Sequence, residues 1–459
     1  KNRSRGFGLR SIRPEVSSYA KELFGEPSDR TVRTGLSPDL IRADMMEMGR
    51  NTEIIRDELF REVVRDAFQA FRIDRVRPYH LADILDMDLD CRSSSPGIPW
   101  QPDYKTRGQV MDDPVACESI LTFWRRVKAG QDIDPPDCKV LYRAHLNKGG
   151  TNPKLRAVYG YGTTITLMEA CFALPLINGY KSEQTPIAYG YDMAIGGAMK
   201  LRKELIRYKE FSCFDFSAFD KTVSAQLIDA AFDVLSYNLD FTRYQNYGVP
   251  DAREQHRVFL YLKEYFINTP LRMHDGTRYV KTGGVPSGSY FTQLIDSIVN
   301  WIVLSYAVRK SHPETKFWLK VFGDDSVLYT NGHIEVEQVS VEVEKVGMKI
   351  NMEKSLQSRD INDIEFLGFR LLEGLPCRKL SRWMDSVYHP EWPDRCWDDF
   401  ASRILGLFYA NCGVHGKFST ICRKVLAMRP FELKYSRDML RMLRVLGVSD
   451  TSTNLPDDD

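Results

Sequence analysis

The sequence predicts an α+β fold with more than one subdomain. Its 459 residues exceed what a single hydrophobic core usually organises, and its 43% hydrophobic content is that of a folded protein. Short β-prone runs lead into acidic residues at Asp215 and Asp324. Apolar residues at helical spacing fill longer stretches, such as 163–177 and 295–306. Strands that deliver acids and long apolar helices together indicate a small sheet packed against helices.

The same patterns predict further elements along the chain. A hairpin signal surrounds His274-Asp275-Gly276. The stretch 341–344 alternates like a strand, but a helix ended by Gly347 explains its surroundings better. Further helices are expected at 54–68, within 241–270, at 334–346 and from 377 to about 449. Further strands are expected at 348–351 and 364–372, the second closed by a turn at 373–376.

Composition and charge narrow the class of protein. The net charge of +1 neither demands nor excludes a nucleic-acid partner. Nine cysteines without Cys-x-x-Cys pairs argue against a disulfide framework or a zinc site. There is no recognisable signal peptide and no apolar run long enough to span a bilayer, so no membrane partner is expected. Basic residues without acids are concentrated in an N-terminal arm: Lys1, Arg3, Arg5, Arg10 and Arg13.

The turn Gly323-Asp324-Asp325 joins two β-prone runs and is the centre of the predicted site. Glycine followed by two acids favours a tight hairpin turn that projects carboxylates. Because adjacent carboxylates repel one another, they need a cation when they are brought together away from water. Mg²⁺ or Mn²⁺ suits such oxygen ligands. Taken alone, the motif favours an ordinary solvated surface turn, so its interpretation depends on partners elsewhere.

A second pair of acids lies about a hundred residues upstream. A β-prone run ends at Asp215, and Asp220 follows five residues later, where helical spacing begins. Helix capping explains Asp220, but it does not explain Asp215, which lies among aromatic residues where an unpaired carboxylate is costly. If Asp215 and Asp324 end strands of one sheet, they can hold two divalent ions for an in-line phosphoryl displacement.

Basic residues and flexible loops suited to phosphates occur elsewhere. Lys154 and Arg156 sit at alternate positions of a strand-like stretch, so both would face a phosphate or, equally well, solvent. A glycine-serine loop at 283–289 opens a helix and lacks the ending of a Walker loop. Lys354 is a candidate proton donor to a departing pyrophosphate. The loop 92–100, rich in serine, glycine and proline, favours an ordinary linker on composition alone.

Three motifs in order resemble motifs A, B and C of viral RNA-dependent RNA polymerases. They are Asp215-x4-Asp220, Ser287-Gly288-x4-Thr292 and Gly323-Asp324-Asp325. The stretch 287–297 is similar to motif B of partitiviruses, with picobirnaviruses as near neighbours, both of them double-stranded RNA viruses. The resemblance extends over about 92–370 and implies a right hand closed by fingertips, with an antiparallel palm sheet flanked by helices. The implied division is an N-terminal arm and helical extension at 1–90, fingers at 91–205, palm at 206–240, an insertion at 241–282, palm at 283–372, and a helical thumb with a C-terminal tail at 373–459.

The resemblance also assigns roles to residues. Asp215, Asp324 and Asp325 would be catalytic ligands of two Mg²⁺ or Mn²⁺ ions, with Lys354 as the motif D lysine. Asp220 would sense the ribose 2′-hydroxyl. Ser287, Gly288 and Thr292 would shape a loop that adjusts to template and nucleotide, and Lys154 and Arg156 resemble motif F at the nucleotide channel. The motif G residues at the template entrance would be Ser94, Ser95, Pro96 and Gly97, and 366–368 resembles motif E beside the thumb.

One residue departs from the pattern of positive-strand RNA viruses. Their motif B helix places an asparagine against the acid at 220, whereas this chain has Asp296. Two acids cannot share one hydrogen bond unless one is protonated or a water or cation intervenes. Asn300, one turn further along, is the alternative partner for ribose recognition.

The resemblance implies an RNA-directed RNA polymerase that replicates and transcribes a viral double-stranded RNA genome. Its partners would be template and product RNA, nucleoside triphosphates and a viral capsid protein, within a virion in the host cytoplasm. Two alternatives remain. A reverse transcriptase is disfavoured by the acid at 220, where a bulky gate would exclude a 2′-hydroxyl. A non-catalytic RNA-binding replication or capsid-associated protein would use the basic arm and C-terminal helices instead.

Overall fold

A computed structural model describes residues 14–25, 31–33, 37–144, 146–148, 155–390, 394–436 and 439–440. The basic arm before residue 14 lies outside these ranges, as do Lys154 and all residues after 440. The predictions that concern those residues are therefore not described further. Among the described residues, no helix is long and apolar enough to cross a membrane.

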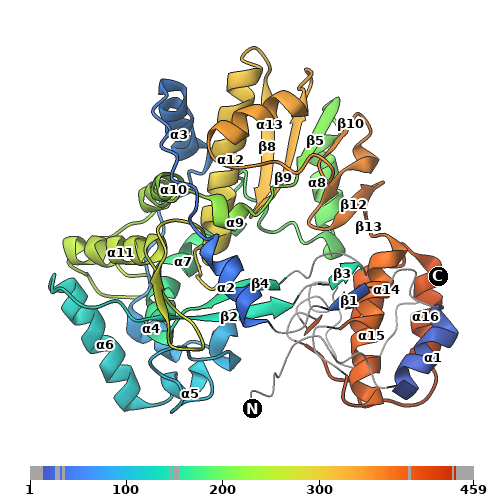
Figure 1. The fold of residues 1–459 in the computed structure, drawn as a ribbon, viewed down its shortest axis with the longest axis horizontal. Coiled ribbons are helices and arrows are strands. Elements are labelled where there is room, and N and C mark those ends of the chain that lie inside the picture. The colour runs from blue at the N-terminus through green and yellow to red at the C-terminus, as the bar shows by residue number, and fades with distance from the viewer. Residues whose placement is uncertain are drawn as a thin grey trace.

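A four-stranded antiparallel sheet carries the acidic residues (Figure 1). Its strand order is β10 (Leu356–Ser358), β5 (Glu210–Phe214), β9 (Asp325–Thr330) and β8 (Phe317–Phe322). Alternation along the strands sends Phe211 and Val327 to one face, where they pack with Leu201 of α8 (Gly197–Leu205). Leu328 faces the opposite side and joins the main core. The sheet is therefore buried on both faces, and only its turns and edges reach solvent.

Helices on the main-core side support the sheet. The buried helix α12 (Thr292–Ser311) contacts β8, and α13 (Val336–Lys345) packs against α12 (Figure 1). The other helices of this side are α3 (Glu58–Ala70), α9 (Phe219–Thr222) and α10 (Ala225–Tyr237). One continuous apolar core runs through these helices from Ile41 to Ile350.

A second sheet and its helices form the next part of the molecule. Its strand order is β4 (Leu155–Gly160), β2 (Cys138–Ala144), β6 (Pro270–Arg272) and β7 (Arg278–Val280). The helix α7 (Thr163–Ser182) follows β4 and is buried along most of its length. The surrounding helices are α4 (Leu81–Asp86), η1 (Asp90–Ser93), α5 (Arg107–Met111), α6 (Pro114–Lys128) and α11 (Ala252–Ile267). The short helix η2 (Met193–Ile195) instead packs with α8 beside the first sheet.

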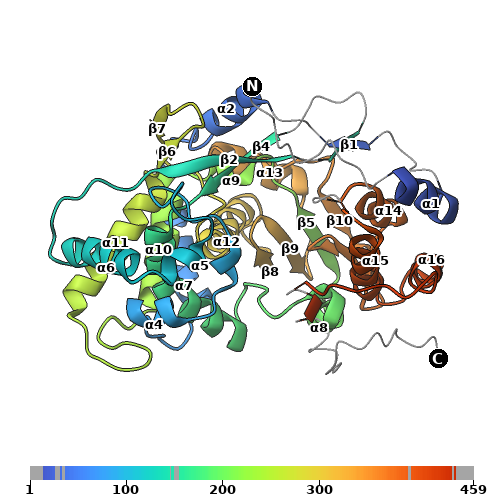
Figure 2. The same ribbon diagram turned by 90° about the horizontal axis from the view of Figure 1, so that it is seen from below.

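The C-terminal helices form a separate core with the first helix. They are α14 (Leu380–Tyr388), α15 (Trp397–Asn411) and α16 (Gly416–Leu426), joined by α1 (Pro14–Phe24). Figure 2 shows α1 beside these helices, on the side of the molecule opposite α6 and α11. Further along, β1 (Thr31–Arg33) pairs with β3 (Leu146–Lys148) in a separate two-stranded sheet, and α2 (Pro38–Met46) contacts β4 of the second sheet. The N-terminal segment thus connects the C-terminal helices to the second sheet, as expected for a hand closed by fingertips.

Most predicted elements are confirmed, including α3, α7, α12, α13 and the hairpin β6–β7. Gly347 ends α13 with a positive φ of 79°, so the strand alternative at 341–344 is wrong. Helix within 241–270 is confined to α11. After α16 the described residues contain helix only at 439–440, although the sequence predicted helix to about 449. The subdomain boundaries stay a prediction.

Two predicted strands are wrong in detail. The stretch 348–351 is not a strand, because only Ile350 bridges to Phe216 and the edge of β5 is occupied later by β10. The stretch 364–372 is a hairpin instead of one strand, since Leu367 and Gly368 adopt positive φ angles of 51° and 75°. It forms β11 (Glu365–Phe366) and β12 (Phe369–Leu372). The short helix η3 (Ile361–Asp363) precedes this hairpin, and β13 (Leu375–Cys377) follows it and pairs with β12.

Candidate active site

The acidic turn connects β8 to β9. Phe322 pairs with Asp325, which leaves Gly323 and Asp324 as the two turn residues. Gly323 has a φ of 65°, and a Cβ at this position would lie 2.9 Å from the Gln293 amide nitrogen. The positive φ favours glycine here, whereas the Gln293 amide is the end of a flexible side chain that could shift away from a Cβ. The side chains of Asp324 and Asp325 are exposed, as the hairpin prediction expected.

Helix α12 holds this turn from behind. The Gly323 N–H donates to the Ser297 hydroxyl over 2.9 Å. The Asn300 amide donates to the carbonyl oxygens of Gly323 at 3.0 Å and Asp325 at 3.3 Å. Asn300 is fully buried beneath the turn. In this geometry its hydrogen bonds fix the carboxylate-bearing hairpin, and its part in ribose recognition stays a prediction.

Asp215 reaches the same edge of the sheet from β5. Phe214 pairs with Ser326, so Asp215 lies beside Asp325 at the next position of the ladder. Its N–H donates to the Ser355 hydroxyl over 3.0 Å, and its carbonyl oxygen accepts from the Asn351 N–H over 2.7 Å. Lost hydration and the charges of Asp324, Asp215 and Glu365 raise the pKa of Asp325 to about 6. The predicted carboxylate cluster is thus assembled.

The donor chemistry of this cluster fits a divalent cation. Carboxylates that repel one another are stabilised when a cation neutralises them. Within the part of the chain that the structure describes, however, no group of three or more His, Cys, Asp or Glu side chains is arranged so that it could hold a metal ion by itself. Mg²⁺ is commonly bound through one or two carboxylates, with water and substrate phosphates completing its shell. Asp215, Asp324 and Asp325 therefore fit an open site that a nucleotide completes.

Lys354 lies beside this cluster, as predicted. Its ammonium is 3.9 Å from an Asp215 carboxylate oxygen, and both side chains are partly exposed. Asp215, Asp325 and Lys354 line a cavity of about 850 Å³. The hairpin β11–β12 contributes Leu367 and Gly368 to the same cavity. The predicted motif D and motif E residues therefore meet at the carboxylates.

A second cavity, of about 510 Å³, lies on the other side of the turn. Among its lining residues are Arg156, Asp220, Ser287 and Asp324, which come from four separate predicted motifs. Asp44 of α2 also lines this cavity, forms an ion pair with Lys221 and accepts from the Ala157 N–H over 2.8 Å. No local sequence signal pointed to Asp44, because its place depends on the packing of α2 against β4.

Asp220 and Asp296 meet beside this cavity. Burial and the charge of Asp324 raise the pKa of Asp220 to about 6, while Arg156 partly opposes this effect. The pKa of Asp296 is raised further, by complete burial and by the charges of Asp220 and Asp324. The contact between the two acids and their raised pKa values favour one shared proton on the more deeply buried Asp296, which donates to Asp220. Asp296 therefore lies against Asp220, where the positive-strand pattern has an asparagine, and its part in ribose recognition stays a prediction.

The loop before α12 fits closely against β4. A Cβ at Gly288 would lie 1.7 Å from the Tyr159 carbonyl oxygen, so only glycine is tolerated. The Ser287 hydroxyl accepts from the Tyr159 N–H at 3.5 Å. The Thr292 hydroxyl donates to the carbonyl oxygens of Pro286, at 2.6 Å, and Ser289. Thr292 therefore shapes the loop from within, and Ser287 is the residue that faces the cavity.

The predicted template-entrance loop is held at the start of α7. The N–H and hydroxyl of Thr163 both donate to the Pro96 carbonyl oxygen, at 2.9 and 2.8 Å. Ser94 accepts from Arg107 and Ser95 from Gln101, each at 3.0 Å. Gly97 has a φ of 69° and approaches Gly162 too closely for a side chain. An ordinary linker does not describe this loop, because hydrogen bonds and close backbone packing hold it in place.

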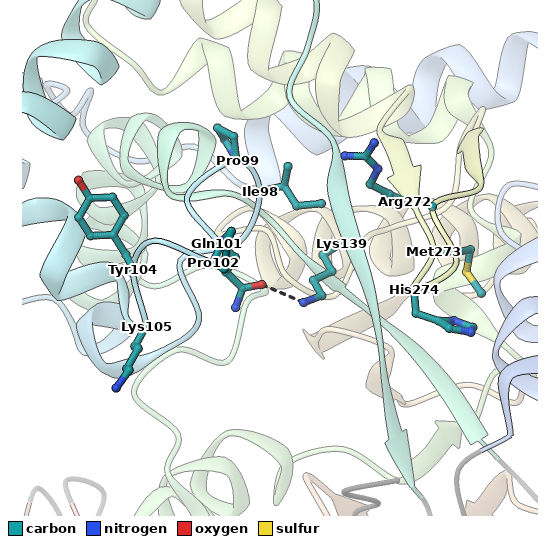
Figure 3. A pocket seen from close by; sticks show the side chains of 11 residues that line it. Ile98, Pro99, Gln101, Pro102, Tyr104, Lys105, Lys139, Arg272, Met273 and His274 are labelled. Atoms are coloured by element: carbon teal, nitrogen blue, oxygen red, sulfur yellow. Dashed lines mark hydrogen bonds between the residues drawn. The ribbon is translucent and has the colours of Figure 1, made fainter. Parts of the chain in front are cut away.

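A cavity of about 880 Å³ adjoins this loop (Figure 3). Pro99 and Ile98 form one wall, while Lys139 projects from β2 and donates to Gln101 over 2.8 Å. The other basic residues that line it are Lys105, Arg272 and His274, and no acid is among its lining residues. A cavity lined by cations next to a fastened loop is suited to a phosphate backbone.

The sheet, the acidic turn and the surrounding helices define the right-hand class of nucleic-acid polymerases. The solved structure titled Sicinivirus 3Dpol RNA dependent RNA polymerase shares this fold with a TM-score of 0.73 and 15% identity, over 97% of this chain and 96% of that one. A family model described as viral RNA-dependent RNA polymerase matches residues 59–391. The chain therefore belongs to the viral RNA-dependent RNA polymerase family.

Three curated relatives are RNA-directed RNA polymerases of double-stranded RNA viruses, as the motif B wording predicted. That of Cryptosporidium parvum virus 1 is 26% identical over 74% of this chain and 66% of its own length. That of Atkinsonella hypoxylon virus is 26% identical over 72% and 53%, and that of White clover cryptic virus 1 is 25% identical over 66% and 52%. The chain thus spans between about half and two thirds of the length of these relatives.

The protonated state of Asp296 predicts a specific effect of pH on stability. An unfolded aspartate ionises near pH 4, so the raised folded pKa costs the native protein stability as pH rises from there towards that pKa. Asp296→Asn keeps a donor for Asp220 and cannot ionise. We expect a gain of at least about 1.4 kcal/mol at pH 8, the equivalent of a tenfold change in proton affinity, and no gain near pH 4.

Denaturant unfolding of the metal-free protein between pH 4 and 8 measures this difference. Asp296→Ala is the control, because it removes the donor and leaves Asp220 buried without it. A loss of stability in Asp296→Asn across the whole range would contradict the assignment of the proton to Asp296.

Proposed function

We propose that this chain synthesises RNA on an RNA template from nucleoside triphosphates, and that it replicates and transcribes a viral double-stranded RNA genome. The observation that carries the proposal is the assembly of Asp215, Asp324 and Asp325 at one sheet edge, next to the cavity that contains Asp220 and Arg156. Separate motifs meet there in the arrangement that two-metal nucleotidyl transfer needs.

The side chains divide the work of the reaction. Asp215, Asp324 and Asp325 would hold two Mg²⁺ or Mn²⁺ ions. When bound, these ions lower the pKa of the 3′-hydroxyl and neutralise charge on the triphosphate. The 3′-oxygen forms a bond to the α-phosphorus while the bond to pyrophosphate breaks. Arg156 attracts the triphosphate, and Lys354, next to Asp215, gives its proton to the leaving pyrophosphate.

The Asp220–Asp296 pair supports selection of ribonucleotides. Because Asp296 carries the proton and donates a hydrogen bond to Asp220, the Asp220 carboxylate stays an acceptor. It keeps a free lone pair that can accept from a 2′-hydroxyl. A deoxyribonucleotide would leave this acceptor without a partner in a partly desolvated cavity, which costs binding energy. This argument favours RNA synthesis over reverse transcription.

The cation-lined cavity in Figure 3 supports a path for template RNA. It continues from the template-entrance loop, and its lysines and arginine are suited to the phosphates of a single strand. From the resemblance to double-stranded RNA virus polymerases we also propose a capsid protein as partner, in a virion in the host cytoplasm. The non-catalytic RNA-binding alternative explains the cations but gives no reason for three mutually repelling carboxylates at one edge.

Removing the central ligand tests the catalytic proposal. We expect Asp324→Ala to reduce nucleotide incorporation by at least about a thousandfold, because the open metal site loses a carboxylate. RNA affinity should change little, since Asp324 repels phosphate. Incorporation of labelled ribonucleotides and deoxyribonucleotides on a single-stranded RNA template, with Mg²⁺, measures the first quantity, and filter binding measures the second. Asp233→Ala, an exposed acid of α10, is the matched control. Incorporation that Asp324→Ala leaves undiminished would disprove the mechanism.

Lys354 is tested by separating chemistry from binding. We expect Lys354→Ala to slow single-turnover incorporation by about a hundredfold, the lower range for a general acid, with a much smaller change in nucleotide affinity. Lys345→Ala removes an exposed lysine of α13 as the control. An effect confined to KM would show that Lys354 only binds the nucleotide.

The template path is tested by salt dependence. The double variant Lys105→Ala with Lys139→Ala should weaken RNA binding and make the slope of log K against log salt less steep by about 1.4, as expected for two lost single-strand phosphate contacts. The double variant Lys203→Ala with Lys345→Ala removes the same charge elsewhere. Equal slopes for the two double variants would exclude this cavity as an RNA site.

A further inference from the structure

The loop 283–290 links β7 to α12 and presents Ser287 to the cavity that contains Asp324. Where Ser287 lies depends on how the two ends of this loop are held. At each end, a charged residue that belongs to no recognised motif is buried against the loop. These residues are Lys281 and Glu169, and neither lines the two cavities at the acidic turn.

Lys281 holds the first end. Its side chain is 4% exposed, and its ammonium donates to the carbonyl oxygens of Ile267 at 2.9 Å, Gly284 at 3.0 Å and Gly283 at 3.3 Å. It also donates to the Phe266 carbonyl. Burial lowers the pKa of Lys281 to about 7. Through these four carbonyl partners, Lys281 ties the end of α11 to the start of the loop.

Glu169 holds the second end from the middle of α7. Its side chain is fully buried, and it accepts from the Ser289 hydroxyl at 2.6 Å and the Tyr290 N–H at 3.0 Å. Ser289 in turn accepts from the Phe291 N–H over 3.0 Å, at the entrance to α12. Burial raises the pKa of Glu169 to about 8. The hydrogen bonds of this carboxyl therefore all go to the loop.

Between these anchors, Pro286 and Ser287 accept hydrogen bonds from the Thr292 hydroxyl and the Tyr159 N–H. The Val285 N–H donates to the Asp220 carbonyl oxygen over 2.6 Å, which extends the first anchor to the motif A segment. Only residues 286–288 remain between the anchors, and they include Ser287. The same helix α7 that carries Glu169 holds the template-entrance loop through Thr163. Six residues of helix, about 9 Å, separate the two attachments.

We propose that Glu169 and Lys281 are positioning residues for nucleotide binding, which fix both ends of the loop 283–290 and thereby set where Ser287 lies. The inference rests on the proposed function only for its kinetic consequence. Anchoring itself is a property of the chain without substrate. Loss of either anchor should therefore loosen the loop and weaken the fit of the nucleotide without changing the carboxylates.

Hydrogen exchange followed by mass spectrometry tests the anchoring directly. In Glu169→Ala and in Lys281→Met, we expect exchange of peptides that cover 283–291 to accelerate by about tenfold, as for one lost buried hydrogen bond. Exchange in β5 and β9 should stay unchanged. Glu169→Gln keeps an acceptor and a donor in the same shape and should retain slow exchange. Cys171→Ala, a buried substitution in the same helix, controls for cavity formation.

Incorporation kinetics test the consequence. We expect Glu169→Ala to raise the KM for the nucleotide by about tenfold with little change in RNA affinity, and Glu169→Gln to restore it. Ser289→Ala should have a smaller effect that is not additive with Glu169→Ala, because both remove the same hydrogen bond. Unchanged exchange in 283–291, equal acceleration in β5 and β9, or full additivity would overturn the inference. A wild-type chain without incorporation would overturn the proposed function, while the exchange data would still decide the anchoring.

Discussion

The active site depends on the register between β5 and β9. Phe214 opposite Ser326 is what brings Asp215 beside the turn at Asp324. Side chains alternate along a strand, so a slip of one residue would turn Asp215 to the other face of the sheet. The register is fixed by burial, since Phe211 and Val327 belong to one apolar cluster and Leu328 to another. The packing of two cores therefore determines where the carboxylates lie.

Helix α12 contacts three separate parts of the active site. Thr292, Asp296 and Asn300 are spaced by four residues and lie along one side of the helix. They serve in turn the loop, the Asp220 carboxylate and the acidic hairpin. Mutual repulsion among the acids is tolerated because Asp296 is neutral and because the hairpin backbone is held by hydrogen bonds. A rigid scaffold of this kind keeps like charges together at the expense of stability.

Local patterns were sufficient to predict the strand that ends at Asp215, the hairpin at Asp324 and the long helices, because each depends on spacing within a short window. They failed at 348–351, where the sequence favours a strand but β10 pairs with the edge of β5 instead. They also failed at 367–368, where positive φ angles turn the chain into a hairpin. Motif order indicated the site residues, but not the function of Asn300 or the presence of Asp44, Glu169 and Lys281. Those depend on contacts between segments far apart in the chain, which no local window contains.

The packing of α1 with the C-terminal helices has a consequence for biosynthesis. Val16 and Ala20 share a core with Phe400 and Phe418, and the Tyr388 hydroxyl donates to the Gly25 carbonyl across 363 residues of sequence. During synthesis α1 leaves the ribosome long before the helices that it packs against. Its apolar face therefore stays unburied until α15 and α16 have been synthesised. Completion of the hand is thus a late and non-local event, and the slow closure of such distant contacts makes the nascent chain vulnerable to aggregation.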